Sequence, residues 1–404
     1  MLIQTDTISH QEDESMDAVL FAKMLSDKSI TDLHKMQHKY SAAEVTELIS
    51  LLTESIFKVL PLRDFSGASL VYMENVAQVR MSAYKTLLSP QNAAGTYGLK
   101  AMEDEIHSTL TIENINSSRD SIRRILSGYA PKDEEENRIY GMKHGLEFIG
   151  DSANKITEES IFKLYTLTVG DFLDDDDKLL PGNYYRHDNV YVVGSNVEHQ
   201  GLPHTKLPQY MKVLIAFVSA DDKMNDLLKA AAIHFYIAYL HPYFDGNGRM
   251  ARLIHLWYLV QQGYPAALFV PFSSYIGTTK GGYYKACTQA EDNTKISGLM
   301  DITPFLVYFI ENVYNKIQCA TAQNDTIKIY QKALVNGKIT EKEKDLFQFV
   351  LSAYGDGEFS TKQLEKDFGN AAYATIRGFV LKFEKLGVLA GQKYGNRVKY
   401  RVVR

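Results

Sequence analysis

Cysteine and tryptophan are scarce in this chain, and long apolar runs are missing from it. Its 404 residues include two cysteines and one tryptophan. Two cysteines, Cys287 and Cys319, are too few for a disulfide framework or a cysteine-rich zinc site, so we expect a reducing compartment. No stretch reaches the ~18 apolar residues of a membrane helix, and the N-terminal MLIQTDTISHQEDESMD lacks the basic and apolar parts of a signal peptide. The sequence therefore predicts a cytoplasmic protein without membrane contact.

The remaining composition is that of an ordinary globular chain. Hydrophobic residues make up 45% and charged residues 23%, and the length predicts two or three domains. The net charge of −5 conceals an asymmetry, because residues 325–404 carry 15 Lys and Arg against 9 Asp and Glu. A basic C-terminal part is suited to nucleic acid, although a solvated surface is the more frequent reason for such charge.

Apolar spacing predicts a mainly helical chain. Helical periodicity covers 17–60, resumes over 70–88 after DFSGAS, and returns at about 137–149, 207–260 and 304–335. The best short strand in the first 300 residues is the VYVV segment that starts at Val190. This segment lies among turn residues, so we expect a hairpin or flap between helices.

The C-terminal part has its own pattern. After a boundary near 325–340, three helical segments precede two basic strands joined by a turn at Gly395–Asn396. Three helices followed by a basic hairpin resemble a winged-helix module, which predicts possible DNA contact through residues 340–404.

The most informative stretch is HFYIAYLHPYFDGNGRMARLIHLWYL, residues 234–259. Pro242 disfavours helical backbone at His241, so the first helix should end there. Gly246, Asn247 and Gly248 tolerate positive φ, which lets their N–H groups turn inward.

The next helix is expected to begin near Gly248, and its positive N-terminus should attract an anion. Arg249 and Arg252 share one face of that helix and can bind further phosphate oxygens. Asp245 becomes useful if it holds a Mg²⁺ ion that also contacts phosphate. His241 can accept a proton near neutral pH. These parts predict a polyphosphate site with a metal and a general base, and no Walker Gly-Lys-Ser/Thr sequence follows.

The segment HPYFDGNGRMAR is similar to the Fic-family signature His-x-Phe-x-Asp/Glu-Gly-Asn-Gly-Arg-x-x-Arg, with Tyr243 in place of the usual Phe. PGNYYRHDNVYVVG also resembles the family's segment before the flap, so the likeness spans roughly residues 105–315. It implies a mainly α fold: a Fic-type helical core with a short β-hairpin flap, plus a small C-terminal α+β winged-helix domain. The expected division is a helical region over 1–104, the catalytic core over 105–320 and the winged-helix-like part over 325–404.

The resemblance implies a protein adenylyltransferase that uses ATP and Mg²⁺. His241 would deprotonate a Ser, Thr or Tyr hydroxyl of a target protein, and Asp245 would hold the metal. The nucleotide would be bound by Gly246, Asn247, Gly248, Arg249 and Arg252, with Tyr284 or its neighbour Tyr283 lining the adenine pocket. The flap, Val190, Tyr191, Val192, Val193 and Gly194, would dock the target as an added strand. Self-modification and a homodimer are further possibilities that the resemblance leaves open.

Many Fic proteins carry an inhibitory motif, Ser/Thr-x-x-x-Glu-Gly/Asn, and residues 109–114 read TLTIEN. Thr109 and Glu113 lie four apart on one face of an expected helix over about 105–114, and Asn114 can end it in the left-handed region. The resemblance implies that Glu113 pairs with Arg252 and occupies the γ-phosphate position.

Other functions remain open at this point. The enzyme could use another donor such as UTP or CDP-choline, or transfer phosphate, and in some relatives the same glutamate supports AMP removal. A different class is a DNA-binding regulator in which the winged helix acts and the Fic core senses nucleotide.

Overall fold

The computed structural model describes residues 16–76, 78–88, 99–193, 197–317, 329–330, 332–334, 336–354, 357–395 and 397–403. The fold is mainly helical, and its strands form three two-stranded antiparallel sheets within the described residues. Two compact units divide the chain: residues 1–78 with 285–307, and residues 79–284 with 308–404. In the described part of the chain, no helix is both long and apolar enough to cross a membrane.

The first unit combines three helices with a hairpin. Its elements before residue 78 are α1 (Ala18–Leu25), α2 (Leu33–Lys39), α3 (Ala42–Ser55), β1 (Phe57–Arg63) and β2 (Ser69–Met73), followed by the 3-10 turn Glu74–Val76. Helix α3 begins with a reciprocal capping box between Ser41 and Glu44. The core of this unit contains Met24, Ile30, Met36, Val45, Leu48, Leu52 and Met73.

The hairpin corrects the helices that were expected up to residue 60 and again from residue 70. Strand β1 pairs antiparallel with β2, with Phe57 opposite Met73 and Arg63 opposite Ser69. The Asp64 side chain accepts hydrogen bonds from the N–H groups of Ser66 and Ala68. This local turn reverses the chain, so two apolar runs that suit either helix or strand pair with each other.

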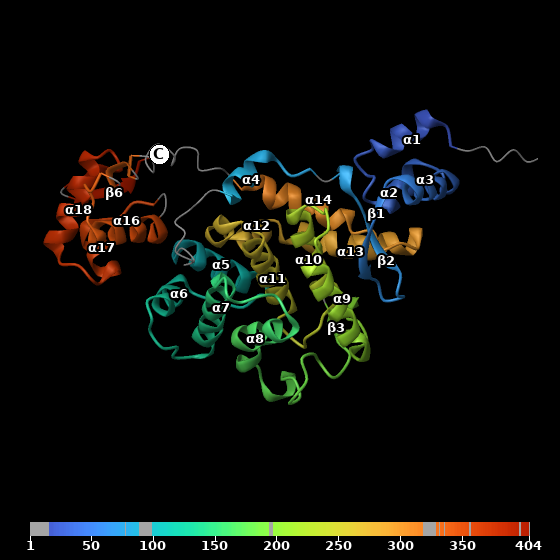
Figure 1. The fold of residues 1–404 in the computed structure, drawn as a ribbon, viewed down its shortest axis with the longest axis horizontal. Helices are drawn as coiled ribbons and strands as arrows, with labels where there is room; N and C mark the ends of the chain where they lie inside the picture. The colour runs from blue at the N-terminus through green and yellow to red at the C-terminus, as the bar shows by residue number, and fades with distance from the viewer. Residues whose placement is uncertain are drawn as a thin grey trace, which may run out of the picture. The chain divides into compact units, whose positions relative to one another are not determined.

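The second unit contains the long central helices of the chain (Figure 1). Its helices up to residue 240 are α4 (Met81–Leu87), α5 (Leu99–Ile112), α6 (Arg119–Leu126), α7 (Glu134–Gly150), α8 (Glu158–Thr168), α9 (Leu207–Ser219) and α10 (Asp226–Leu240). Strands β3 (Tyr191–Val193) and β4 (Val197–Gln200) form a hairpin between α8 and α9. Three 3-10 turns accompany them, at Gly170–Phe172, Asp175–Asp177 and His204–Lys206.

The chain continues with α11 (Asn247–Gln261), the 3-10 turn Pro265–Phe269, α12 (Phe272–Thr278), α13 (Lys280–Ser297), α14 (Thr303–Asn312) and the 3-10 turn Tyr314–Lys316. Helices α13 and α14 each have residues in both units. The helix expected over 304–335 is shorter than predicted, because α14 ends at Asn312. Residues 318–328 lie outside the described part of the chain.

Helices α10 and α11 pack against each other at the centre of the second unit. Almost every side chain of α10 is buried, as expected for a helix that is apolar on all faces. Trp257 of α11 is fully buried and meets Phe148 of α7 edge to face at 5.4 Å between ring centroids. The two helices therefore provide a rigid support for the loop that joins them.

The C-terminal residues have a hydrophobic core of their own. Here α16 (Glu341–Ala353), α17 (Thr361–Phe368) and α18 (Tyr373–Lys385) precede the antiparallel strands β5 (Leu389–Tyr394) and β6 (Arg397–Val402). A bridge between Phe359 and Tyr400 adds a short third strand segment. The expected helices and hairpin are present, and Asn396 of the expected turn lies outside the described residues. Helix α17 ends at Gly369 in the left-handed region, with φ of 68°.

Candidate active site

A tight corner joins the end of α10 to the start of α11. Helix α10 stops at Leu240 because Pro242 follows, and His241 takes the left-handed conformation with φ 53° and ψ 61°. Gly246 is also left-handed, with φ 82°, and α11 begins at Asn247. A histidine at positive φ is uncommon, and such backbone gathers at functional sites. The predicted end of α10 is confirmed, and α11 begins one residue earlier than expected.

The corner differs from the expected run of three left-handed residues. Of Gly246, Asn247 and Gly248, only Gly246 has positive φ, because the other two already belong to α11. Asn247 instead locks the loop: its Oδ1 accepts from the N–H of Tyr243 at 2.9 Å, and its Nδ2 donates to the carbonyl of Tyr243 at 2.8 Å. Tyr243 stacks on Tyr165 with 3.8 Å between ring centroids, which shows why an aromatic ring suits this position.

Arg186 supports the corner from the segment before the flap. Its guanidinium donates to three backbone carbonyls, those of His241 at 2.8 Å, Asp188 at 2.5 Å and Leu202. The backbone N–H of Arg186 donates to the carbonyl of Pro242 at 3.0 Å. Burial lowers the pKa of Arg186 to about 10. Although PGNYYRHDNVYVVG carried the family resemblance, sequence reasoning gave this arginine no role, because its partners are backbone atoms far along the chain.

The imidazole of His241 is oriented as a base. Its Nδ1 lies 3.3 Å from the carbonyl oxygen of Ala238, and since a carbonyl only accepts, Nδ1 carries the proton and Nε2 keeps its lone pair. Burial, helped by His199 and Arg186, lowers the pKa of His241 to about 4. The ring is therefore neutral at physiological pH, and its pKa lies below the near-neutral value that the sequence predicted.

Asp245 and Arg249 form an ion pair at the N-terminus of α11. The Arg249 Nη2 lies 2.6 Å from Asp245 Oδ2, and Asp245 Oδ1 accepts from the N–H of Gly246 at 2.5 Å. The Arg249 side chain is buried, whereas 54% of the Asp245 side chain is exposed. Within the described chain, Arg249 Nε is buried without a hydrogen-bond partner.

Arg252 binds the end of α5. Its Nε donates to Thr109 Oγ1 at 2.7 Å, and its Nη2 lies 2.6 Å from Glu113 Oε1 and 3.3 Å from the Thr109 carbonyl. A Cβ built on Gly248 would come within 2.2 Å of Glu113 Oε1, so this carboxylate lies directly against the first turn of α11. Arg252 Nη1 is buried without a hydrogen-bond partner among the described residues. The ion pair expected between Glu113 and Arg252 is thus present.

Helix α5 is held in place along its length. The buried Glu105 accepts from the N–H of Ser273 at 2.9 Å and from its hydroxyl, at the start of α12. Burial raises the pKa of Glu105. The hydroxyls of Ser108 and Ser274 lie 2.8 Å apart. After α5, Asn114 is left-handed with φ 58°, as expected for a residue that ends a helix.

The remaining predicted residues lie at the edge of this site or outside the described part. Tyr191, Val192 and Val193 form β3, and Gly194 is outside the described residues. Tyr284 is 40% exposed, and its hydroxyl lies 3.5 Å from the Ile112 carbonyl at the end of α5. Its neighbour Tyr283 is buried, and its hydroxyl lies 2.8 Å from His234 Nε2. The role of Tyr284 at the adenine stays a prediction.

Magnesium binding at Asp245 stays a prediction, because both oxygens of this carboxylate already have partners, Arg249 and the N–H of Gly246. The described residues contain no group of three or more His, Cys, Asp and Glu side chains that could hold a metal by themselves. Mg²⁺ is commonly bound by one or two carboxylates, water and substrate phosphates, so a full protein cage is not needed. Asp245 offers one half-exposed carboxylate beside the α11 N-terminus, where phosphates would lie.

The arrangement combines a neutral histidine base, a helix N-terminus and two buried arginines. The N–H groups of the first α11 turn and two guanidinium groups favour a multiply charged anion. A carboxylate from the turn directly after α5 already occupies part of this position, since Glu113 contacts Arg252. The geometry suits transfer of a phosphorus-bearing group to a nucleophile deprotonated by His241.

Comparison with known proteins identifies the same region. A family model described as the Fic/DOC family matches residues 155–259. "Protein adenylyltransferase Fic" of Drosophila ananassae is 27% identical over 176 residues, which cover 42% of this chain and 34% of that protein. The protein of the same name in Culex quinquefasciatus is 27% identical over 186 residues, covering 42% and 35%. The chain thus spans about a third of the length of these curated relatives.

Two solved structures are also similar. A Fic family protein from Desulfovibrio desulfuricans G20 aligns over 80% of this chain and 91% of its own, with 17% identity and a TM-score of 0.48. Fic-1 (aa134–508) from C. elegans aligns over 63% of this chain and 73% of its own, with 20% identity and a TM-score of 0.43.

Proposed function

Because the chain is a member of the Fic/DOC family, we propose that it is a protein adenylyltransferase. It transfers the AMP part of ATP to a Ser, Thr or Tyr hydroxyl of a target protein. The observation that carries this proposal is the neutral His241 at the corner before α11. Its Nδ1 donates to the Ala238 carbonyl, which leaves Nε2 to accept a proton. The name shared by the matched relatives supports the reaction type.

The proposed reaction is one displacement at phosphorus. His241 Nε2 removes the proton of the target hydroxyl while that oxygen bonds to the α-phosphorus of ATP. The bond between the α-phosphorus and the bridging oxygen of pyrophosphate breaks, and pyrophosphate leaves with that electron pair. The proton stays on His241 and is later released to solvent or to the leaving group. The low pKa of His241, about 4, favours this release.

The residues of α11 would bind the triphosphate. The N–H groups from Gly246 to Gly248 would contact the α- and β-phosphates, and Arg249 and Arg252 would bind the outer oxygens. The unpartnered Nε of Arg249 and Nη1 of Arg252 support this assignment, because buried guanidinium N–H groups need acceptors. Asp245 would hold Mg²⁺, which supplies positive charge against the leaving pyrophosphate.

Labelled nucleotides test the reaction type. Incubation with ATP labelled at the α-phosphate should label protein, whereas ATP labelled at the γ-phosphate should not. His241→Ala should lower α-label transfer at least about 100-fold, the scale of a lost general base. Transfer of the γ-label would show a phosphotransferase instead.

Glu113 is proposed to restrain this activity. Its carboxylate neutralises Arg252 at 2.6 Å and lies against Gly248, so it would exclude the γ-phosphate from this position. Glu113→Gly should tighten ATP binding at least about tenfold in a calorimetric titration. Glu113→Gln, which removes the charge but keeps an amide near Arg252, should fall between this variant and wild type. Equal ATP affinity in all three proteins would remove the restraint from the account.

The nucleotide donor and the reverse reaction are tested separately. Thermal shifts with Mg²⁺ and ATP, UTP or GTP compare the donors, and the proposal expects the largest shift with ATP. A purified AMP-modified protein mixed with wild type and Glu113→Gly distinguishes restraint from AMP removal. Loss of AMP with wild type alone would assign Glu113 to removal.

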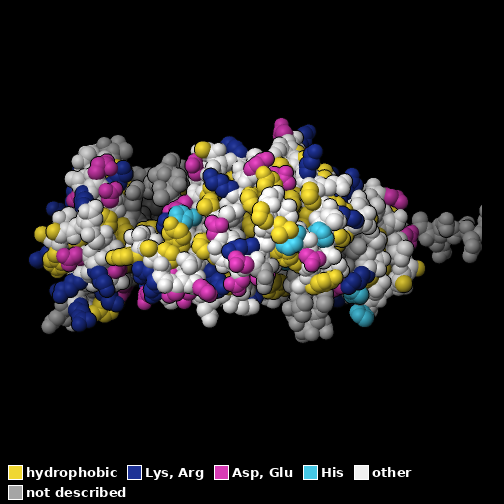
Figure 2. Space-filling view, turned by 90° about the horizontal axis from the view of Figure 1, so that it is seen from below, with side chains coloured by type: hydrophobic (Ala, Val, Ile, Leu, Met, Phe, Trp, Pro, Cys, Tyr) yellow, Lys and Arg dark blue, Asp and Glu magenta, His cyan; other side chains and the backbone are white. Residues whose placement is uncertain are grey.

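DNA contact is a second candidate function for the C-terminal residues. Three helices and a hairpin with its own core support a winged-helix module there. Lys393, Arg397, Lys399 and Arg401 are exposed along β5 and β6, and Figure 2 shows Lys and Arg side chains on the face of the molecule it presents. Duplex binding that weakens steeply with salt would support this function. No binding at low salt would leave target recognition or dimer contact as the role of the module.

A further inference from the structure

A polar pocket lies at the far ends of the two central helices. It is lined by the first turn of α10, the last turn of α11, the end of α9 and the loop after α7, all within the second unit. Its volume is about 380 Å³, within the lower range of small-molecule sites. The corner with His241 is at the opposite ends of α10 and α11. This pocket is therefore separate from the proposed active site.

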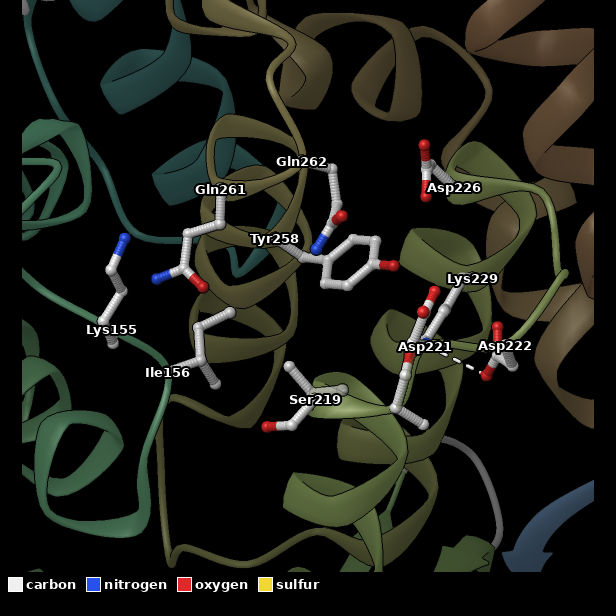
Figure 3. Close-up of a pocket in the computed structure, with 12 residues that line it drawn as sticks. Lys155, Ile156, Ser219, Asp221, Asp222, Asp226, Lys229, Tyr258, Gln261 and Gln262 are labelled. Atoms are coloured by element: carbon white, nitrogen blue, oxygen red, sulfur yellow. Dashed lines mark hydrogen bonds and ion pairs between the residues drawn. The ribbon is translucent and has the colours of Figure 1, made fainter.

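The charges at one side of the pocket are not balanced. Asp221, Asp222 and Asp226 line this side together with a single buried ammonium, that of Lys229, which pairs with Asp222 (Figure 3). Asp226 Oδ2 accepts from the Tyr264 hydroxyl at 3.1 Å. Lys229 Nζ is already engaged, since it lies 2.9 Å from Asp222 Oδ2 and donates to the Ala220 carbonyl at 2.8 Å. No Lys or Arg in the described chain forms an ion pair with Asp221 or Asp226.

Tyr258 gives an independent reason to expect a ligand. Its side chain is 2% exposed and lines the pocket, where Figure 3 shows its hydroxyl directed toward the acidic side. Among the described residues, none exchanges a hydrogen bond with this hydroxyl. Burial, together with Asp226 and Asp222, raises the pKa of Tyr258, so the hydroxyl keeps its proton. The hydroxyl reaches the pocket, where a bound ligand can exchange a hydrogen bond with it.

The opposite side of the pocket is different. The exposed Lys155 lies there next to Gln261 (Figure 3). Gln261 Nε2 donates to the Asn154 carbonyl at 3.0 Å, which leaves its Oε1 toward other donors. A second cation would be repelled by Lys155 on this side, whereas a carboxylate or a neutral polar group would not.

We propose that this pocket binds a small molecule that carries one primary ammonium group and a polar tail without positive charge. The ammonium has three donors and meets Asp221, Asp226 and the Tyr258 oxygen as acceptors. Its charge offsets the excess carboxylates, and the tail extends toward Lys155 and Gln261. The site is assigned independently of the adenylyl transfer reaction.

Calorimetric titration of the full chain with 5-aminopentanoate tests the proposal, with pentanoate and 1,5-pentanediol as probes of similar length that lack the ammonium. The amine should bind saturably, with a dissociation constant at or below about 1 mM, and the other two should not. Tyr258→Phe, which keeps the ring, and Asp226→Asn should each weaken binding at least about tenfold. Asp120→Asn, at a carboxylate with 96% of its side chain exposed on α6, is the matched control and should bind like wild type.

Two results would overturn the assignment. One is the absence of saturable amine binding to wild type at millimolar concentration while circular dichroism shows the folded protein. The other is binding that Tyr258→Phe and Asp226→Asn leave unchanged, because the amine then binds elsewhere on the acidic surface.

Discussion

At the scale of single residues, the site depends on side chains that fix backbone atoms. Asn247 holds the loop through both backbone groups of Tyr243, and Arg186 holds the carbonyl of His241. These contacts keep His241 in a left-handed conformation that a non-glycine residue seldom adopts. The imidazole therefore arrives at the corner in a set orientation before any substrate binds.

The pH dependence of the reaction should reflect the buried state of His241. A base with a pKa of about 4 instead of 6.5 stays neutral as pH falls through the range where an exposed histidine is protonated. We expect kcat/KM for modification by Glu113→Gly to hold from pH 7 to about 5 and to fall near pH 4. The free energy of unfolding should also fall as the pH is lowered. The unfolded histidine binds a proton before the folded one does, so the stability linked to His241 is lost between pH 6.5 and 4. A decline in kcat/KM centred on pH 6.5 would contradict the buried, neutral imidazole.

Arg186 should be irreplaceable by lysine although the charge is kept. Lysine has one ammonium and cannot reach three carbonyls with a planar fork. We expect Arg186→Lys to lower the free energy of unfolding by about 1–3 kcal/mol and the rate of AMP transfer by at least about tenfold. Denaturant melts and transfer rates measure both. Arg80→Lys, at an exposed arginine of the same unit, should change neither; an unaffected Arg186→Lys would remove its positioning role.

At the scale of elements, α5 is the part whose position decides access to α11. Its last turn brings Thr109 to Arg252, the turn directly after it brings Glu113 there, and Glu105 fixes α5 to the start of α12. The Glu105 carboxylate also lies near the N-terminus of α12, and negative charge there stabilises that helix. The restraint proposed for Glu113 therefore depends on contacts two turns away.

Weakening the contact between Glu105 and Ser273 should release part of the restraint that Glu113 places on AMP transfer. We expect Glu105→Ala or Ser273→Ala to raise AMP transfer above wild type but below Glu113→Gly, because Glu113 keeps its own pair with Arg252. The rate of AMP transfer and the affinity for ATP should both be measured, and the affinity should increase together with the rate. Ser50→Ala, at an exposed serine of α3 in the first unit, is the control. Variants that stay folded and transfer AMP no faster than wild type would show that Glu105 does not position α5.

The sequence predicts elements well where local chemistry decides them. Pro242 and Gly246 mark the end of α10 and the approach to α11, and the TLTIEN pattern places Glu113 and Thr109 on one face. The hairpin β1–β2 was missed because its apolar runs fit helix and strand equally, and pairing between them decides the outcome. The contacts of Arg186 and Glu105 join residues far apart in the chain, which no local pattern contains.

At the scale of the whole molecule, the chain combines a central helical region with a C-terminal part that has a separate hydrophobic core. The core of that part is formed entirely by residues between Tyr330 and Val402. Ligands of the corner should therefore act mainly on α10, α11 and α5. With Glu113→Gly and ATP–Mg²⁺, we expect slower amide hydrogen exchange in these helices and little change in α17 and α18, whereas α16 packs against α5 and can respond with it. Equal protection of both parts would show that they respond as one.

The central claim is that the corner between α10 and α11 transfers AMP. The most direct test is intact-protein mass spectrometry of Glu113→Gly after incubation with ATP–Mg²⁺ and a lysate, followed by peptide mapping of the modified proteins. The account predicts one added AMP group on a Ser, Thr or Tyr of this chain or of a target, and none with Glu113→Gly combined with His241→Ala. AMP addition that persists without the imidazole, or its absence from every protein although Glu113→Gly binds ATP, would contradict the account.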